Sequence, residues 1–178
     1  MADDRHANGP MTSDIAAAMQ RVRFSHINIV ARDWDRLAQF YVNALGCTRL
    51  DPERDYDGPE LDRGTGLNGA RLSGIHLRLP GYEDSKGPTL EIFQYDPEGE
   101  DPPRSVNRIG YGHICFQVNN VKAMQERILK LGGKKVGEVV TLSPSSSASV
   151  TWCYVRDPEG NIIELQRWSG FGFRPVRG

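Results

Sequence analysis

Two kinds of side chain that bind transition metals recur in this chain in the order His, Glu, His, Glu. They are His26, Glu91, His113 and Glu164, and each stands in a short apolar segment with the composition of a β-strand. Imidazoles and carboxylates are ligands that borderline divalent cations accept. We therefore expect one divalent metal ion as cofactor, and nickel, zinc, cobalt, manganese and iron all tolerate this set of ligands.

The alternation of polar and apolar residues indicates which way these side chains point. Successive side chains of a strand lie on opposite faces, so His26 and Asn28 share one face while Ile27 and Ile29 share the other. The other three segments alternate in the same way. We expect the apolar faces to pack against helices and the polar faces to line a cavity. Three weaker candidates for contact with a substrate share that cavity face: His76, Phe93 and Tyr95.

The elements that must position these residues follow from periodicity and turn chemistry. Apolar residues at helical spacing predict helices at 32–46 and 120–133, each ended by glycine. Asp, Gly and Pro predict a loop at 52–69, and a serine-rich stretch predicts another at 143–149. The strands are expected at 23–31, 47–51, 70–80, 88–95, 111–118, 134–142 (one strand or two), 149–157 and 161–168.

The two halves of the chain resemble each other. HINIVARDWDRLAQFYVNALG and HICFQVNNVKAMQERILKLGG both begin with a candidate histidine and end with glycine. Such a repeat, with the alternation described above, predicts an α+β fold of two βαβββ modules, with a curved mixed sheet around a central cavity and the helices outside. The expected divisions are a flexible N-terminus with a short helix (1–21), a first module (22–96), a linker (97–109), a second module (110–168) and a C-terminal tail (169–178).

These motifs, together with the ending VRDPEGNIIELQRW, resemble the vicinal oxygen chelate superfamily over roughly residues 22–168. That superfamily includes glyoxalase I, methylmalonyl-CoA epimerase, extradiol dioxygenases and the bleomycin resistance proteins. The resemblance implies that the two βαβββ modules pair into a curved mixed-sheet half-barrel around a metal, which the four residues named above would hold. It also implies a homodimer, and leaves open whether the cavity forms within one chain or between two.

The His-Glu-His-Glu set is most similar to that of bacterial glyoxalase I. The resemblance implies a lyase or isomerase in which a metal polarises a substrate carbonyl and a glutamate moves a proton through an enediolate or enolate. Glu91 and Glu164 are both candidates for that catalytic base. Two positions depart from glyoxalase I, since Val30 and Tyr95 stand where it has an arginine and an asparagine that hold glutathione. The substrate is therefore left unassigned.

Three alternatives stay open beside this reading. Methylmalonyl-CoA epimerase usually has glutamine at the position of Glu91. An iron-dependent extradiol dioxygenase needs two histidines and one carboxylate, which His26, His113 and Glu164 would supply with Glu91 left over. A resistance-type protein would sequester its ligand without chemistry, and a complete set of metal ligands gives such a protein no advantage.

The overall composition excludes several functional classes. A formal net charge of −1 gives no basic surface for nucleic acid. No apolar run reaches the ~20 residues of a membrane helix, and the N-terminus lacks the pattern of a signal peptide. Cys47, Cys115 and Cys153 are odd in number and widely spaced, which favours reduced thiols in the core. We expect a cytoplasmic protein that acts on a small molecule.

Overall fold

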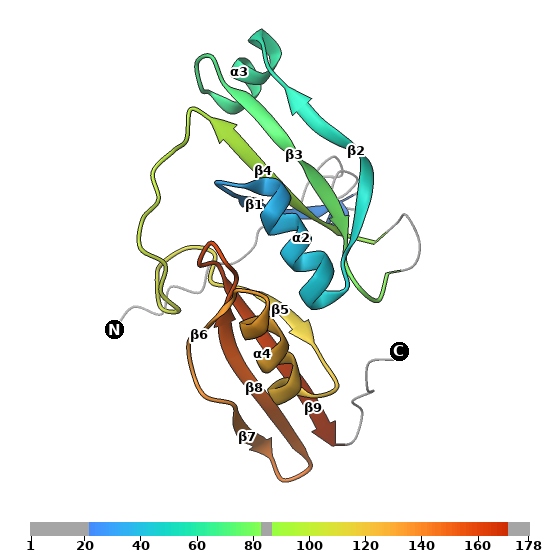
Figure 1. Cartoon of the computed structure of the whole chain (residues 1–178). Coiled ribbons are helices and arrows are strands. Elements are labelled where there is room, and N and C mark those ends of the chain that lie inside the picture. Colours follow the sequence, from blue (N-terminus) through green and yellow to red (C-terminus); the bar gives the residue numbers. More distant parts are fainter. Residues whose placement is uncertain (1–21, 83–86, 171–178) are drawn as a thin grey trace, which may run out of the picture.

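Two β-sheets, each covered by a helix, make up the chain (Figure 1). The computed structural model describes residues 22–82 and 87–170, so the helix expected within 1–21 and most of the expected tail lie outside the described residues. The first sheet has the order β1-β4-β3-β2, and the second has the order β5-β9-β8-β6 with β7 paired to β8. The first module comprises β1 (His26–Val30), α2 (Trp34–Leu45), β2 (Thr48–Tyr56), α3 (Pro59–Thr65), β3 (Arg71–Arg78) and β4 (Thr89–Asp96). The second comprises β5 (Ile114–Gln117), α4 (Val121–Lys130), β6 (Lys134–Lys135), β7 (Val140–Ser145), β8 (Ala148–Arg156) and β9 (Ile162–Gly170).

The topology confirms the α+β class and the repeat. In each module the first strand runs parallel to the last, β1 to β4 and β5 to β9, and the remaining pairs are antiparallel. Within the described part of the chain no strand pairing joins the two sheets. Each module therefore supplies a sheet of its own.

Both predicted helices form, and local capping sets where they begin. The side chain of Asp33 accepts a hydrogen bond from the Arg36 backbone at the start of α2, and Asn120 does the same for Ala123 at the start of α4. Gly46 ends α2 with a φ of 76°, a left-handed conformation that favours glycine. The buried faces of the two helices then pack on the apolar faces of the sheets.

The two loops expected from composition are partly regular structure, so those predictions are wrong in part. Residues 52–56 continue β2, which pairs with β3 across an irregularity between Leu50 and Arg54. Proline is tolerated there because β2 is an edge strand. Pro59 then begins α3, where its missing N–H costs nothing. In the serine-rich stretch, β7 and β8 form a hairpin closed by the pairing of Ser145 with Ala148.

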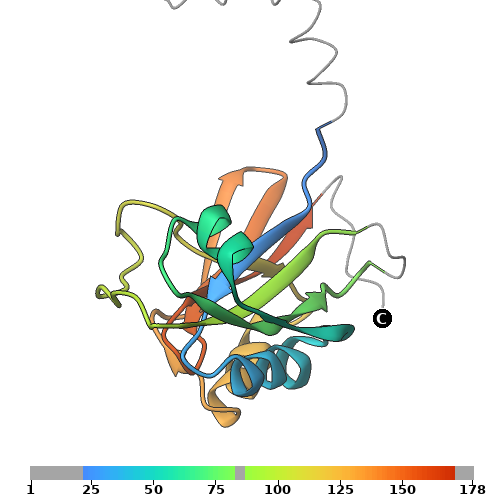
Figure 2. The same ribbon diagram turned by 90° about the horizontal axis from the view of Figure 1, so that it is seen from above.

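The two modules are held together by a buried contact between α2 and the turn after β8. The Tyr41 hydroxyl of α2 donates a hydrogen bond to the Asp157 carboxylate, with an O–O distance of 3.1 Å, and neither residue is exposed to solvent. The same carboxylate accepts from the backbone and side chain of Asn161 and from the Glu159 backbone. Helices α2 and α4 consequently lie side by side on the same side of the sheets (Figure 2).

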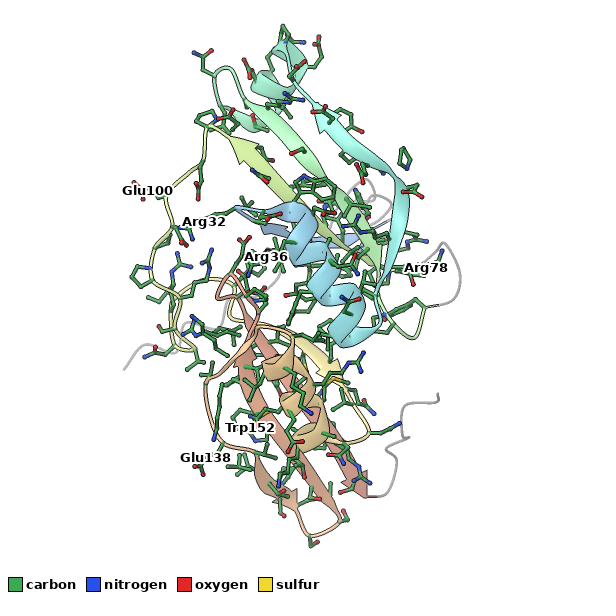
Figure 3. All side chains as sticks on the ribbon, in the orientation of Figure 1. Arg32, Arg36, Arg78, Glu100, Glu138 and Trp152 are labelled. Atoms are coloured by element: carbon green, nitrogen blue, oxygen red, sulfur yellow. The ribbon has the colours of Figure 1, made fainter. Side chains whose placement is uncertain are left out.

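Charged contacts extend this junction. Glu159 accepts hydrogen bonds from the backbone N–H groups of Arg32 and Asp33, at 2.8 and 2.9 Å. The Arg32 side chain in turn pairs with Glu98 and Asp101 on the connection between β4 and β5, beside which Figure 3 places it. The turn of the second module is thereby fixed to the residues between β1 and α2 of the first.

Replacing Tyr41 by phenylalanine is expected to destabilise the fold by about 2 kcal/mol, because the buried Asp157 carboxylate loses a hydrogen-bond donor. Asp157→Asn is expected to cost more, roughly 3 kcal/mol, since its new amide N–H groups face other donors. Urea unfolding measures both. Tyr56→Phe at an exposed position is the matched control and should stay within about 0.5 kcal/mol of the wild type. Equal stability of Tyr41→Phe and the wild type would contradict this account of the junction.

The cysteine prediction is correct in part. All three cysteines are free thiols, and Cys47 and Cys153 are buried in the core. Burial raises the pKa of Cys47 to about 12 and that of Cys153 to about 11. Cys115, by contrast, is exposed, because it lies on β5 at the open edge of the second sheet. In the described residues no helix has the length and apolar character needed to span a membrane.

Candidate metal centre

The first pair, His26 and Glu91, lies at the open edge of the first sheet. His26 begins the edge strand β1, and Glu91 lies on the neighbouring strand β4. Their closest approach is 3.4 Å, between His26 Nε2 and Glu91 Oε2. Asn28, directly opposite Glu91 in the parallel register, donates to the same Oε2 at 3.4 Å. This contact bears out the expectation that His26 and Asn28 share a face.

Glu91 has a second histidine neighbour on its other side. His76 on β3 pairs with Glu91 across the antiparallel ladder, and its Nε2 is 3.0 Å from Glu91 Oε1. Its Nδ1 is 3.1 Å from the hydroxyl of Thr89. Burial lowers the pKa of His76, the Glu91 carboxylate opposes that change, and the positive charges of Arg54 and His26 add to it. Glu91 itself is 8% exposed and is the buried acid of this face.

The second pair, His113 and Glu164, repeats this arrangement in the second sheet. His113 directly precedes the edge strand β5, and Glu164 lies on the neighbouring strand β9. His113 Nε2 is 2.8 Å from Glu164 Oε2. Two aromatic rings of β8 lie beside this pair: the Tyr154 ring is 5.2 Å from that of His113 and 5.0 Å from that of Trp152.

The strand registers explain why the two pairs correspond. Glu91 lies opposite Asn28 on one side and His76 on the other, whereas Glu164 lies opposite Cys115 and Tyr154. The pairs therefore share their positions but differ in their neighbours. Glu91 has a polar neighbour at each oxygen, since Asn28 donates to Oε2 and His76 Nε2 lies 3.0 Å from Oε1. Within the described residues, the one polar contact to Glu164 is that of His113 at Oε2.

The spacing in both pairs fits two ligands of one metal ion. Ligands that bind a first-row divalent metal at roughly 2.1 Å lie roughly 3 Å from each other. The separations of 3.4 Å and 2.8 Å between imidazole nitrogen and carboxylate oxygen are of that size. Across residues 22–82 and 87–170, however, no three His, Cys, Asp or Glu side chains of the chain are arranged to hold a metal together. One chain thus presents two separate His–Glu pairs, each with half of the four expected ligands.

The family model for the Glyoxalase/Bleomycin resistance protein/Dioxygenase superfamily matches residues 23–165, which span both modules. The chain belongs to this superfamily. Among curated superfamily proteins it is 27% identical over 146 residues to the lactoylglutathione lyase of Salmonella typhimurium, covering 81% of this chain and 91% of that one. It is 22% identical over 145 residues to the ethylmalonyl-CoA/methylmalonyl-CoA epimerase of Cereibacter sphaeroides, covering 82% and 97%.

A solved structure of the superfamily has the same architecture. The glyoxalase family protein from Bacillus cereus superposes with a TM-score of 0.69 at 26% identity, covering 84% of this chain and 95% of that protein. The superfamily assignment and the fold expected from the sequence are thereby confirmed. The superfamily includes enzymes that act on small molecules, and the low identities leave the reaction of this chain to be argued from its own residues.

The three weaker cavity candidates have different surroundings. His76 contacts Glu91, and the Phe93 ring lies 5.8 Å from that of His76. Phe93 occupies this place because Gly74 stands opposite, where an added Cβ would come within 2.6 Å of the ring. Tyr95 lies two residues further along β4, opposite Leu72 and away from the first pair.

Sequence reasoning missed the role of Asn28 and Tyr154 as neighbours of the two glutamates. The sequence predicts the correct face for Asn28 but not its contact with Glu91. That contact depends on the parallel register of β1 with β4. Tyr154 lies opposite Glu164 through the β8–β9 register. A position-by-position comparison of the two modules aligns Tyr154 with His76. That alignment is the signal in the sequence that identifies Tyr154 as a neighbour of Glu164.

Proposed function

We propose that this protein is a divalent-metal-dependent lyase or isomerase of the glyoxalase type, which moves a proton beside a substrate carbonyl. The observation that carries the proposal is the presence of two matched His–Glu pairs on equivalent edge positions of the two sheets. His26, Glu91, His113 and Glu164 would together hold the ion. Because one chain presents them as two half-sites, a complete centre joins the first pair of one copy to the second pair of another.

The exposed edges of the sheets support this assembly. β1 and β5 are edge strands, and the segments around them carry apolar side chains in contact with solvent. An exposed apolar sheet edge is a surface on which another chain can pair. A two-fold symmetric dimer that places β1 against the partner's β5 would cover both edges at once and bring the half-sites together twice. The exposed residues concerned are Val22, Phe24, Ile27, Val30, Ile109 and Tyr111.

The two glutamates are suited to different tasks. A bound divalent ion supplies Lewis-acid polarisation of the substrate carbonyl, which makes the adjacent C–H more acidic. Glu91 is held at both oxygens, so it is fitted to remain a ligand. Glu164 is held at Oε2 alone and has the Tyr154 ring beside it. We assign Glu164 as the base that takes the proton from one carbon and returns it to the neighbouring one.

The substrate class follows from what surrounds the pairs. Trp152, Tyr154 and Phe93 supply half-buried aromatic surface, as is usual in small-molecule sites. Val30 and Tyr95 provide no cation or amide at the positions implied for holding glutathione. A 2-oxoaldehyde–thiol adduct with a thiol other than glutathione, or an acyl thioester, fits this lining. The likeness to an acyl-CoA epimerase favours the thioester as the second candidate.

Metal content and proton exchange test the proposal together. The purified protein is expected to bind about one divalent ion per chain. With that ion it should exchange solvent deuterium into a 2-oxo–thiol adduct or an acyl thioester without consuming oxygen. Removal of the ion by a chelator should abolish the exchange, and adding it back should restore the exchange. Oxygen uptake with catechols would instead identify a dioxygenase, and a protein that takes up no metal would identify a ligand-sequestering protein.

A further inference from the structure

His76 is the one histidine near the proposed centre that the proposed ligand set does not use. It lies on β3, on the far side of Glu91 from the edge strand that carries His26. The two histidines contact different oxygens of the same carboxylate, His26 at Oε2 and His76 at Oε1. Glu91 therefore has a histidine on each side, and Asn28 also donates to its Oε2.

Both ring nitrogens of His76 are occupied. Nε2 is 3.0 Å from Glu91 Oε1 and Nδ1 is 3.1 Å from the hydroxyl of Thr89. In the neutral tautomer that carries its hydrogen on Nε2, the ring donates to Glu91 and Nδ1 accepts from the threonine. No lone pair is then left to ligate a metal. The ring is also packed edge-on against Phe93, which limits its rotation.

The second module has no equivalent of the contacts that His76 makes with Glu91 and Thr89. The residue opposite Glu164 is Tyr154, which takes the place that His76 has opposite Glu91. Thr89 and Ile162 correspond to each other, because each lies two positions before the glutamate of its module. Ile162 has no hydroxyl. A hydrogen-bonded chain of threonine, histidine and glutamate therefore occurs in one half-site alone, so it is not a consequence of the shared module architecture.

We propose that His76 is a positioning residue that fixes Glu91 as a permanent, single-oxygen metal ligand, with Thr89 holding the histidine ring in place. The inference rests on the proposed function, because it presupposes that Glu91 binds a metal. Hydrogen bonds from neighbouring groups orient a metal ligand and raise its affinity for the ion, and their loss commonly costs 10–100-fold in affinity. His76 touches neither ion nor substrate in this role, so its effect is on metal affinity and on the orientation of Glu91.

Metal affinity of the full-length protein tests the role, with cobalt(II) as the probe in competition with a chelator. His76→Phe keeps a ring but removes the donor, and is expected to weaken cobalt binding by about 10–100-fold. His76→Gln places an amide N–H near the position of Nε2 and should recover most of the affinity. Thr89→Val should produce a smaller loss in the same direction. Thr151→Val removes a hydroxyl from an exposed cross-strand pair far along the second sheet and should leave the affinity unchanged.

Each outcome of this experiment decides between roles. Weakened binding in His76→Phe with an unchanged cobalt absorption spectrum and recovery in His76→Gln supports positioning. A spectrum that reports one nitrogen ligand fewer would make His76 a ligand and overturn the inference. Equal affinities of wild type and His76→Phe would overturn the role of His76 and leave the proposed function standing. A wild-type protein that binds no divalent ion would overturn both the proposed function and the role of His76. If His76→Phe does not fold, His76→Gln still allows the comparison with the wild type.

Discussion

A mixture of two inactive variants of this protein should be active. One variant carries His26→Ala and Glu91→Ala, and the other carries His113→Ala and Glu164→Ala. In a mixed dimer, the intact first pair of one chain meets the intact second pair of the other, so one of its two centres is complete. Random exchange makes about half of the dimers mixed, and the mixture should recover roughly a quarter of the wild-type activity per chain.

The complementation is measured as deuterium exchange and as metal bound per chain, after the chains are exchanged through mild unfolding and refolding. Each variant alone should have less than about a thousandth of the wild-type activity, because each lacks half of the ligands at every centre. Matched controls mix two variants that lack the same pair, which should give no recovery. If mixed dimers form and remain inactive, the pairs do not complete one another across chains, and the shared centre is wrong.

The main elements of the fold could be predicted from the sequence because their signals are local. The helix that begins after Asp33 has an N-cap, an apolar stripe and a terminal glycine, all within fifteen residues of one another. The placement of His26 and Asn28 on one face needed only the two-residue period of a strand. Repetition of the same elements in the second half then gave the module architecture.

The parts that failed depend on partners far away in the chain. Residues 52–56 read as a loop because Pro, Asp and Arg have low strand propensity, and pairing with β3 overrides that propensity. The contact of His76 with Glu91 depends on the antiparallel register of β3 with β4, which no local sequence pattern encodes. Exposure of Cys115 likewise depends on β5 being an edge strand of the second sheet.

The sequence predicts the two His–Glu pairs of the candidate centre, but not that the pairs lie apart within one chain. Side-chain type and alternation identify His113 and Glu164 as a pair, and the structure places their reactive atoms 2.8 Å apart. In the proposed centre, which pair meets which would depend on the junction between the modules, where Tyr41 contacts Asp157. That junction turns the two edge strands into separate surfaces, so completion of the centre becomes a question of assembly.

The two glutamates should respond differently to the same substitution. Glu91→Gln is expected to weaken metal binding by at least about 10-fold, since the carboxylate is lost and the remaining amide must face the donors of His76 and Asn28. Its turnover should recover in part at a saturating metal concentration. Glu164→Gln removes the proposed base, so turnover should fall by about 10²–10⁴-fold and should not recover when metal is added.

Titrating activity against metal concentration separates the two effects, because Glu91→Gln mainly shifts the midpoint, whereas Glu164→Gln lowers the plateau in addition to any shift from its loss as a ligand. Deuterium exchange at the plateau then reports proton transfer directly, and it should be lost in Glu164→Gln while a measurable rate survives in Glu91→Gln. Glu138→Gln, an exposed glutamate near the β7 side of the second sheet (Figure 3), is the matched control and should behave as wild type. A plateau that falls for Glu91→Gln and holds for Glu164→Gln would exchange the two assignments, with Glu91 as the base and Glu164 as the permanent ligand.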